Sequence, residues 1–260
     1  MRTWLIRLRL RETGNMRKTR FQKTQKPGFS KKPGFLILRN PNILSTMQKT
    51  FLWSIWLIYV AYLLFSDIPP GPSLLHIDGA TVREVWDLSL NFWFLTPLLT
   101  PEVAPVLHPA LEAIFNIVVA WALLFWGFLI DGRGQRWPMS AFLVGAAFLT
   151  NVFYLPWLAL REPNTEVSVE KLSPLEKVAE GRSLPLFLTG VVLASLGWGM
   201  FARPEFGELA ARWRGLVEIV GSDRLAYSFA IDMLMFWLFQ SWLVEEIGRA
   251  SCRERVCHRV

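Results

Sequence analysis

Residues 109 to 130 read PALEAIFNIVVAWALLFWGFLI, and this stretch decides the fold class. Its 22 residues include one ionisable side chain, Glu112, and lack the polar face of a surface helix. A hydrocarbon core about 30 Å thick needs roughly 20 apolar residues in a helix. Four further segments approach that length, at about 49–67, 138–160, 184–202 and 225–244. The sequence therefore predicts an all-α integral membrane bundle with about five transmembrane helices.

The composition agrees with a membrane protein. Hydrophobic residues make up 52% of the 260 residues and charged residues 19%, whereas soluble domains average about 45 to 50% and about 25%. This balance excludes a disordered chain, a collagen-like chain and a disulfide-stapled miniprotein. Trp137 and Trp157 flank the third segment and Trp242 closes the fifth, which suits the headgroup boundary.

The net charge of +7 belongs to the two ends of the chain. Residues 1–46 hold 12 Lys/Arg and one acid, giving +11, and residues 247–260 hold four Arg and one Glu, giving +3. The 200 residues between them hold 12 bases and 19 acids, giving −7. The membrane domain, residues 47–246, is therefore acidic, and we expect the lipid bilayer and no nucleic acid as its partner.

Both ends are candidates for non-structural sequence. Residues 247–256 resemble one translated reading frame of a common short-read sequencing adapter, so 247–260 is expected to be an adapter-derived tail. It holds both cysteines and His258, and without it the chain has two histidines and no cysteine. We therefore expect no metal, no cofactor and no thiol chemistry. The basic leader, 1–46, is either an organelle transit peptide or upstream sequence read in frame.

The connections carry local signals. Asp131–Trp137 is a tight loop, and its Arg133 and Arg136, with Arg161, are expected to contact lipid headgroups. Ser173 and Glu176 match a capping box that opens a short helix. With five spans, the amino end shares a side with the second and fourth loops, and Lys/Arg counts of seven against five weakly favour the cytoplasm or stroma for that side.

Two further patterns concern helix packing. An apolar stripe at 3.6-residue spacing, beside a Glu208–Arg212 pair, predicts an amphipathic helix that lies in the membrane interface or against a partner. The stripe consists of Phe206, Leu209, Trp213, Leu216, Val217 and Val220. Gly190 and Ala194 form a small-xxx-small pair, which favours close helix packing.

A few polar residues lie at membrane depth and are the main functional leads. They are Glu112, Asn116, Asn151, Asp232 and Gln240. A charged group there costs at least about 2.5 to 3.5 kcal/mol, so each calls for a partner or a function. Counting residues from the far side puts Asn116, Asn151 and Asp232 in one polar layer if their helices are neighbours. The layer is either a proton or ion relay with a polar pocket, or a set of interhelical hydrogen bonds.

Several strings resemble a family of uncharacterised multi-span proteins from cyanobacteria and plastids. They are Phe115-Asn116, the loop 130–135 (IDGRGQ), the segment 155–163 (LPWLALREP) and Asp232. The resemblance covers residues of about 50–245. It implies a thylakoid or plastid membrane and favours a transit leader, and it implies no activity.

The sequence leads to two functional hypotheses. The first is a non-enzymatic accessory or assembly component of a photosynthetic membrane, in contact with other membrane-protein subunits. The second is a small proton- or ion-coupled transporter that uses the Asp/Asn cluster. An enzyme acting on lipid ranks third, because no nucleophile elbow, zinc-protease helix or P-loop is present.

Overall fold

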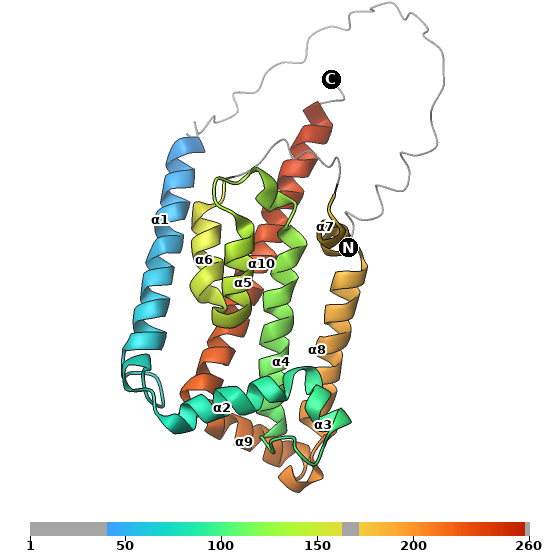
Figure 1. The fold of residues 1–260 in the computed structure, drawn as a ribbon. Coiled ribbons are helices and arrows are strands. Elements are labelled where there is room, and N and C mark those ends of the chain that lie inside the picture. Colours follow the sequence, from blue (N-terminus) through green and yellow to red (C-terminus); the bar gives the residue numbers. More distant parts are fainter. Residues whose placement is uncertain (1–40, 163–171, 258–260) are drawn as a thin grey trace, which may run out of the picture.

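The computed structural model describes residues 41–162 and 172–257, with side chains within 46–162 and 172–247. Most of the predicted leader, residues 1–40, lies outside the described residues. Every regular element in the described part is helical (Figure 1). The α-helices are α1 (Pro41–Val60), α2 (Gly79–Leu90), α3 (Leu95–Leu99), α4 (Pro109–Leu124), α5 (Met139–Leu149), α6 (Asn151–Leu160), α7 (Pro174–Glu180), α8 (Ser183–Phe201), α9 (Leu209–Ser222) and α10 (Arg224–Cys257).

In the part of the chain that the structure describes, four helices are long and apolar enough to span a membrane. They cover Thr46–Phe65, Pro109–Phe128, Ser183–Phe201 and Arg224–Ile247. The first continues α1 through a π-helical turn, Ala61–Phe65, and the second continues α4 through a 3-10 turn, Phe125–Phe128. We call the end of the bundle where α1 begins the amino-terminal face, and the opposite end the far face. Figure 1 shows α1 and α8 running toward the far face and α4 and α10 running back.

The prediction of a fifth span over 138–160 is wrong. This segment forms α5 and α6, of 11 and 10 residues, which are too short to cross at about 1.5 Å per residue. The chain reverses between them at Thr150, and both ends of the hairpin meet at the amino-terminal face. There the Gln135 side chain donates to the Glu162 carbonyl at 2.8 Å and accepts from the Glu162 N–H at 2.8 Å. The second and third loops therefore share the amino-terminal face, contrary to the predicted pairing of the second with the fourth.

Close packing holds the re-entrant hairpin together. Gly145 on α5 lies against the Phe153 ring of α6, and a Cβ at Gly145 would stand 2.3 Å from that ring. On the other side of α6, the Trp56 indole of α1 donates to the Val152 carbonyl at 2.9 Å. Irregular backbone at membrane depth is tolerated where protein surrounds it, and the helices around this hairpin provide that setting.

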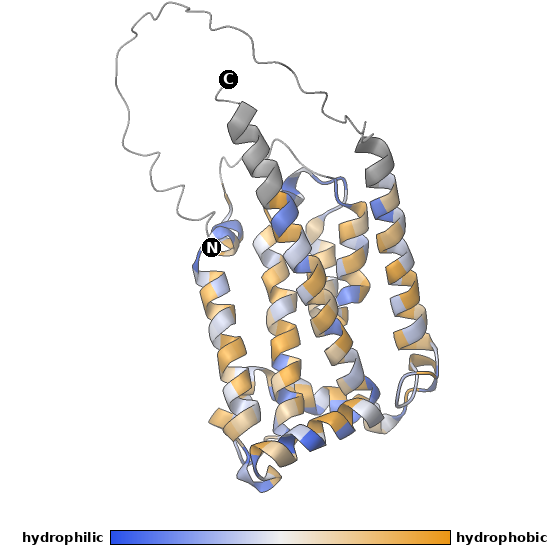
Figure 2. Ribbon diagram, turned by 180° about the vertical axis from the view of Figure 1, so that it is seen from behind, coloured by the Kyte–Doolittle hydropathy of each residue, from blue (hydrophilic) through white to orange (hydrophobic). Residues whose placement is uncertain are grey.

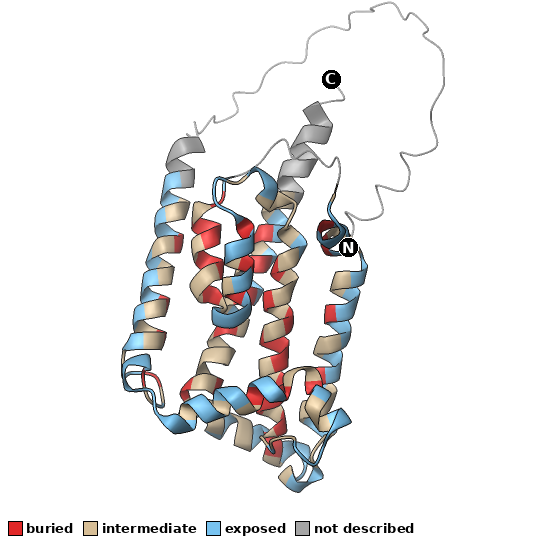
Figure 3. Cartoon of the chain, viewed as in Figure 1, coloured by how far each residue is buried: buried red, intermediate tan, exposed pale blue. Residues whose placement is uncertain are grey.

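The core of the bundle includes the inner side of the hairpin, whereas the outer side of α5 is exposed. Phe125 in the 3-10 turn after α4, Tyr154 on α6 and Phe236 on α10 are completely buried. The Tyr154 ring stands 4.8 Å from the Phe125 ring and 5.3 Å from the Phe236 ring. Figure 3 shows buried residues gathered on α4 and α6, whereas α1 and α8 are largely exposed. Figure 2 shows that these exposed helices are nonetheless apolar. Apolar yet exposed surface is the pattern that lipid contact requires.

The predicted amphipathic helix is confirmed as α9, which lies at the far face with α2 (Figure 1). Leu209, Trp213 and Val217 leave 60%, 65% and 55% of their surface exposed along one side of it. The side chains of Glu208 and Arg212, both within the described residues, do not form the predicted ion pair. Arg212 is buried, and its guanidinium donates instead to backbone carbonyls, those of Gly199, Ala202, Arg203 and Gly207.

The predicted short helix is confirmed as α7, with both hydrogen bonds of the capping box between Ser173 and Glu176. The Glu176 carboxylate also accepts two bonds from Arg133, at 2.5 Å and 2.6 Å. These bonds, with the Ser173 N–H, lower the pKa of Glu176 to about 2. Arg133, predicted to contact lipid headgroups, thus forms an ion pair with Glu176.

Arg161, also predicted to contact lipid headgroups, is engaged within the protein. Arg161 is buried, donates to both oxygens of Asp131 at 2.6 Å and 2.9 Å, and donates to Glu246 at 3.0 Å. These bonds join the end of the hairpin to the preceding loop and to α10. Arg136 is exposed, so it remains a candidate for lipid contact.

Candidate functional site

The five polar residues predicted at membrane depth are all buried, but they do not form one layer. Asn151 and Asp232 meet at the tip of the hairpin. Glu112 and Asn116 belong to a second cluster near the far face. Gln240 stands apart, two turns beyond Asp232 on α10, where its side chain donates to the Trp121 carbonyl at 2.8 Å.

Asp232 is 3% exposed and accepts hydrogen bonds from three neutral side chains. The Tyr59 hydroxyl donates to Oδ1 at 2.6 Å, the Asn151 amide donates to Oδ1 at 2.7 Å, and the Thr150 hydroxyl donates to Oδ2 at 2.7 Å. The Asn151 amide also reaches the Asp232 carbonyl at 3.2 Å. Three elements, α1, the hairpin tip and α10, therefore converge on a single carboxyl group.

Thr150 holds its place at the hairpin tip at the cost of backbone strain. Its φ of 42° and ψ of −117° lie outside the regions open to a β-branched residue. Such outliers cost about 1 to 3 kcal/mol and persist only where surrounding contacts impose them. The hydrogen bond from Thr150 to Asp232 is one of those contacts, so the strained turn and the buried carboxyl group are physically coupled.

A pair of tyrosine hydroxyls lies on the far-face side of this cluster. Tyr62, in the π-helical turn that follows α1, and Tyr227 on α10 share a hydrogen bond of 3.0 Å, and both rings are half-buried. Tyr62 is three residues beyond Tyr59, about one turn farther along the same span. Hydroxyl groups thus extend from the partly accessible end of the bundle toward Asp232.

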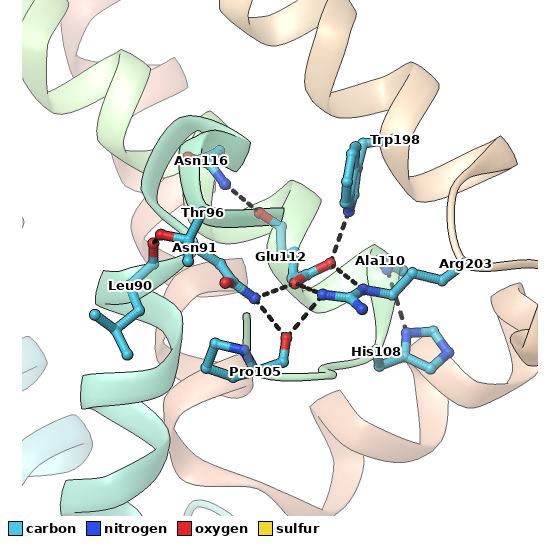
Figure 4. A network of polar contacts seen from close by, with 10 residues as sticks. All are labelled: Leu90, Asn91, Thr96, Pro105, His108, Ala110, Glu112, Asn116, Trp198 and Arg203. Carbon is cyan, nitrogen blue, oxygen red and sulfur yellow. Dashed lines mark hydrogen bonds and ion pairs between the residues drawn. The ribbon is translucent and has the colours of Figure 1, made fainter. Parts of the chain in front are cut away.

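The second cluster has Glu112 at its centre (Figure 4). Glu112 is completely buried, and Arg203 donates to both of its oxygens, at 2.8 Å and 3.0 Å. The Trp198 indole adds a bond of 2.7 Å and the Asn91 amide one of 2.5 Å. Arg203 and Asn91 both continue to the Pro105 carbonyl, at 2.8 Å and 2.9 Å. The cluster fastens the far-face segments to α4 and α8.

Asn116 completes this second cluster rather than the predicted layer with Asp232. Its amide donates to the Glu112 carbonyl at 2.9 Å, and its oxygen accepts the Trp93 N–H at 2.6 Å. Trp93 and Phe94 both have positive φ, 50° and 60°, and the Phe94 ring stacks on Trp198 at 4.6 Å. Asn116 therefore fixes an irregular turn that closes the far end of the bundle.

The two buried carboxylates differ in counter-charge. Glu112 has a bidentate guanidinium, the geometry of a stable ion pair. Asp232 forms no ion pair with any residue of the described part, and all of its donors are neutral. A charge without a partner at this depth is costly, and a carboxyl group can remove that cost by binding a proton. Asp232, and not Glu112, is therefore the chemically active candidate.

A carboxyl group outside the spans, Glu84, has a raised pKa at the far face. Glu84 on α2 lies beside Asp223, which caps α10 by accepting the Ala226 N–H at 2.7 Å. The pKa of Glu84 is raised to about 7, first because the carboxyl group is partly buried. The charge of Asp223, a hydrogen bond between the Glu84 and Asp223 side chains, and the charge of Asp87 raise it further. Glu84 was not a sequence candidate, because an acid on an amphipathic helix carries no local sign of its neighbours.

Other contributors to the sites also escaped sequence reasoning. Tyr59 and Thr150 are residue types common in apolar helices, and Asn91 and Arg203 lie in segments between the spans. The one local signal was Thr150-Asn151, two adjacent polar residues in the middle of an apolar segment. Within the side chains that the structure describes, no group of three or more His, Cys, Asp or Glu is placed to hold a metal ion.

Comparison with known proteins adds no identification. No family model matches the chain, and no curated protein or solved structure shows significant similarity to it. The functional argument therefore rests on the geometry of the polar clusters.

Proposed function

We propose that the protein is a small proton-coupled transporter in which Asp232 binds and releases the proton. The observation that carries the proposal is a buried carboxyl group that accepts three neutral donors and has no cationic partner among the described residues. A carboxyl group of this kind changes the charge of its site whenever it gains or loses a proton. Ionisable residues with this placement are typical of proton relays in membrane transporters.

The hairpin supplies an element that can respond to the proton. Ionised Asp232 accepts bonds at both oxygens, including the bond from the strained Thr150. A proton on either oxygen turns part of the group into a donor and removes acceptor capacity. The contacts that hold Thr150 in its strained conformation then weaken, and release of strain worth about 1 to 3 kcal/mol favours movement of the hairpin tip. Broken helices at mid-membrane serve this purpose in known transporter folds.

Proton uptake into proteoliposomes tests the proposal. We expect Asp232→Asn to abolish proton movement after an imposed pH step, read by an entrapped pH-sensitive dye. Asp67→Asn, which changes an exposed aspartate of the far-face loop, is the matched control and should behave as wild type. Infrared difference spectra should show a carboxylic C=O band on acidification that is missing in Asp232→Asn. Wild-type uptake and an unchanged band in a folded Asp232→Asn protein would exclude the proposal.

A second candidate function is supported by the exposed surface of α8. Leu186, Leu193 and Phe201 leave 70%, 63% and 79% of their surface exposed. A Cβ built on Gly190 meets no atom within 4 Å, so the predicted small-xxx-small pair with Ala194 faces outward and is not used inside the bundle. A helix of another subunit can approach closely there. On this basis the chain is a non-enzymatic accessory or assembly component, and the motif resemblance favours a thylakoid or plastid membrane.

Copurification distinguishes this candidate from the first. A tagged full-length chain extracted in mild detergent should bring membrane-protein partners, and Gly190→Leu should lose them because a large side chain blocks close approach. Gly127→Leu is the control, since a Cβ at Gly127 also meets open space but lies outside α8. If the wild-type protein is recovered only as a monomer and still takes up protons, the accessory-component candidate is excluded and the transporter proposal stands.

A further inference from the structure

A crevice of about 350 Å³ lies at the amino-terminal face, between the ends of α1, α6 and α10. Its floor is apolar, because Leu52 and Leu158 line it and are buried within the bundle. Its rim is charged and includes Lys49, Glu162 and Glu246. An apolar floor beneath a charged rim is the lining expected for an amphiphilic ligand.

The crevice lies at the level of the lipid headgroups. Lys49 is three residues from the start of the first span at Thr46, and Glu246 is one residue from the end of the last span at Ile247. Trp242, which also lines the crevice, has the amphipathic ring that favours the membrane boundary. A lipid in the surrounding leaflet can therefore reach the crevice without leaving the membrane.

Some of the charged groups on the rim are free to bind a ligand, and others are already engaged by the protein. The Arg161 guanidinium is engaged by Asp131 and Glu246. The Lys49 ammonium and the Glu162 carboxylate, in contrast, form no ion pair within the described residues; Glu162 uses only its backbone groups, with Gln135. A carboxylate has about four lone-pair sites, so Glu246 can accept a further bond beside that from Arg161. The rim thus offers one cationic donor and two carboxylate acceptors.

We propose that this crevice binds the headgroup of a phospholipid that carries a primary ammonium group, of which phosphatidylethanolamine is the simplest example. Lys49 donates to the lipid phosphate, and the lipid ammonium donates to Glu162 and Glu246. The glycerol and first acyl carbons cover Leu52 and Leu158. A headgroup with only negative charge meets two carboxylates, and a quaternary ammonium has no N–H to donate, so both bind less well.

This site adds to the proposed transport function and does not depend on it. Its connection with the hairpin runs through Arg161, which lines the crevice and joins the hairpin to Asp131 and Glu246. A lipid that contacts Lys49, Glu162 and Glu246 connects the ends of α1, α6 and α10, and it does so beside the Arg161–Glu246 ion pair. Bound lipid should therefore hold the amino-terminal ends of the hairpin and the last span together.

Native mass spectrometry of the full chain tests the proposal. The protein is reconstituted in nanodiscs of equal parts phosphatidylethanolamine, phosphatidylcholine, phosphatidylglycerol and a neutral glycolipid, and the lipid retained after release is identified. We expect phosphatidylethanolamine to be enriched about tenfold over the others, which corresponds to a difference of about 1.4 kcal/mol.

Charge-removing variants locate the site. Lys49→Gln and Glu162→Gln should each reduce the enrichment to about twofold or less, whereas Lys177→Gln, an exposed lysine on α7 at the same face, should leave it unchanged. Because the side chains of Lys49 and Glu162 form no hydrogen bond or ion pair within the described residues, these variants should fold normally. Equal retention of all four lipids, preference for another lipid, or the same enrichment in Lys49→Gln as in Lys177→Gln would overturn the proposal.

Discussion

Removal of the Arg203 guanidinium should be among the most destabilising single changes in the bundle. Arg203→Met keeps an unbranched side chain as far as the position of Nε, and it removes two bonds to Glu112 and one to the Pro105 carbonyl. Glu112 is completely buried, so its charge would remain without a counter-ion. Breaking a buried pair from one side costs about 3 to 5 kcal/mol, and we expect a loss of that size.

The size of the loss can be separated into parts by a double-mutant cycle. Glu112→Gln with Arg203→Met removes both charges, while Trp198 and Asn91 can still donate to the neutral amide. The double variant should therefore be more stable than Arg203→Met alone, with a coupling energy of at least about 2 kcal/mol. Arg203→Lys, which keeps the charge and loses the bidentate geometry, should fall between wild type and Arg203→Met.

Reversible unfolding in lipid nanodiscs, followed by tryptophan fluorescence, measures these differences. Stability is compared at one lipid composition and one protein concentration, because bound lipid shifts the apparent value. A loss of less than about 1 kcal/mol in Arg203→Met, or a double variant whose loss equals the sum of the two single losses, would refute the assignment of this pair as a buried structural ion pair.

Three further predictions follow from the fold. With the native cysteines replaced by serine, single cysteines at Gln135 and Glu162 should react with an impermeant maleimide from the same side of sealed vesicles; labelling from opposite sides would restore the fifth span. Thr150→Gly should be more stable than Thr150→Ala by about 1 to 2 kcal/mol in thermal unfolding, because both lose the hydroxyl and only glycine relieves the strained φ; the usual order, with alanine more stable, would contradict the strain. Since the pKa of Glu84 in the folded state is raised from 4.5 to about 7, the folded state binds more protons, and the attachment of α2 beside Asp223 should weaken as pH rises through about 7. The protection of the α2 amides against hydrogen exchange, corrected for the intrinsic exchange rate at each pH, should fall between about pH 5 and about pH 8. In Glu84→Gln this corrected protection should not change with pH.

The four spans could be predicted from the sequence because apolar length is a local property. The hairpin could not, since an apolar segment of 23 residues can cross the membrane or turn back within it. What decides between the two is a set of contacts between distant residues, such as Gln135 with Glu162 and Arg161 with Asp131. Helix α2 was also missed, although Asp78 caps it by accepting the Thr81 N–H at 2.8 Å.

Part of the candidate site could also be predicted from local sequence. Asp232 and Asn151 stand out because they are polar within apolar segments, and that rule needs no knowledge of the fold. Counting residues from the ends of the segments brought Asn116 to a similar depth, but depth alone does not give the side of the helix or its neighbours. The structure assigns Asn116 to the Glu112 cluster, and brings Tyr59 and Thr150 to Asp232 in its place.

The comparison of Glu112 with Asp232 shows what a buried acid in a span can and cannot reveal. Both are carboxyl groups of a predicted span, both are buried, and each accepts three or more hydrogen bonds. The same insertion cost applies to each in the sequence, so hydropathy cannot separate them. The difference is that the Arg203 guanidinium balances the charge of Glu112, whereas the donors around Asp232 are all neutral. It is therefore the identity of the partner, and not the presence of an acid at depth, that separates a group that fastens helices from one that can move a proton.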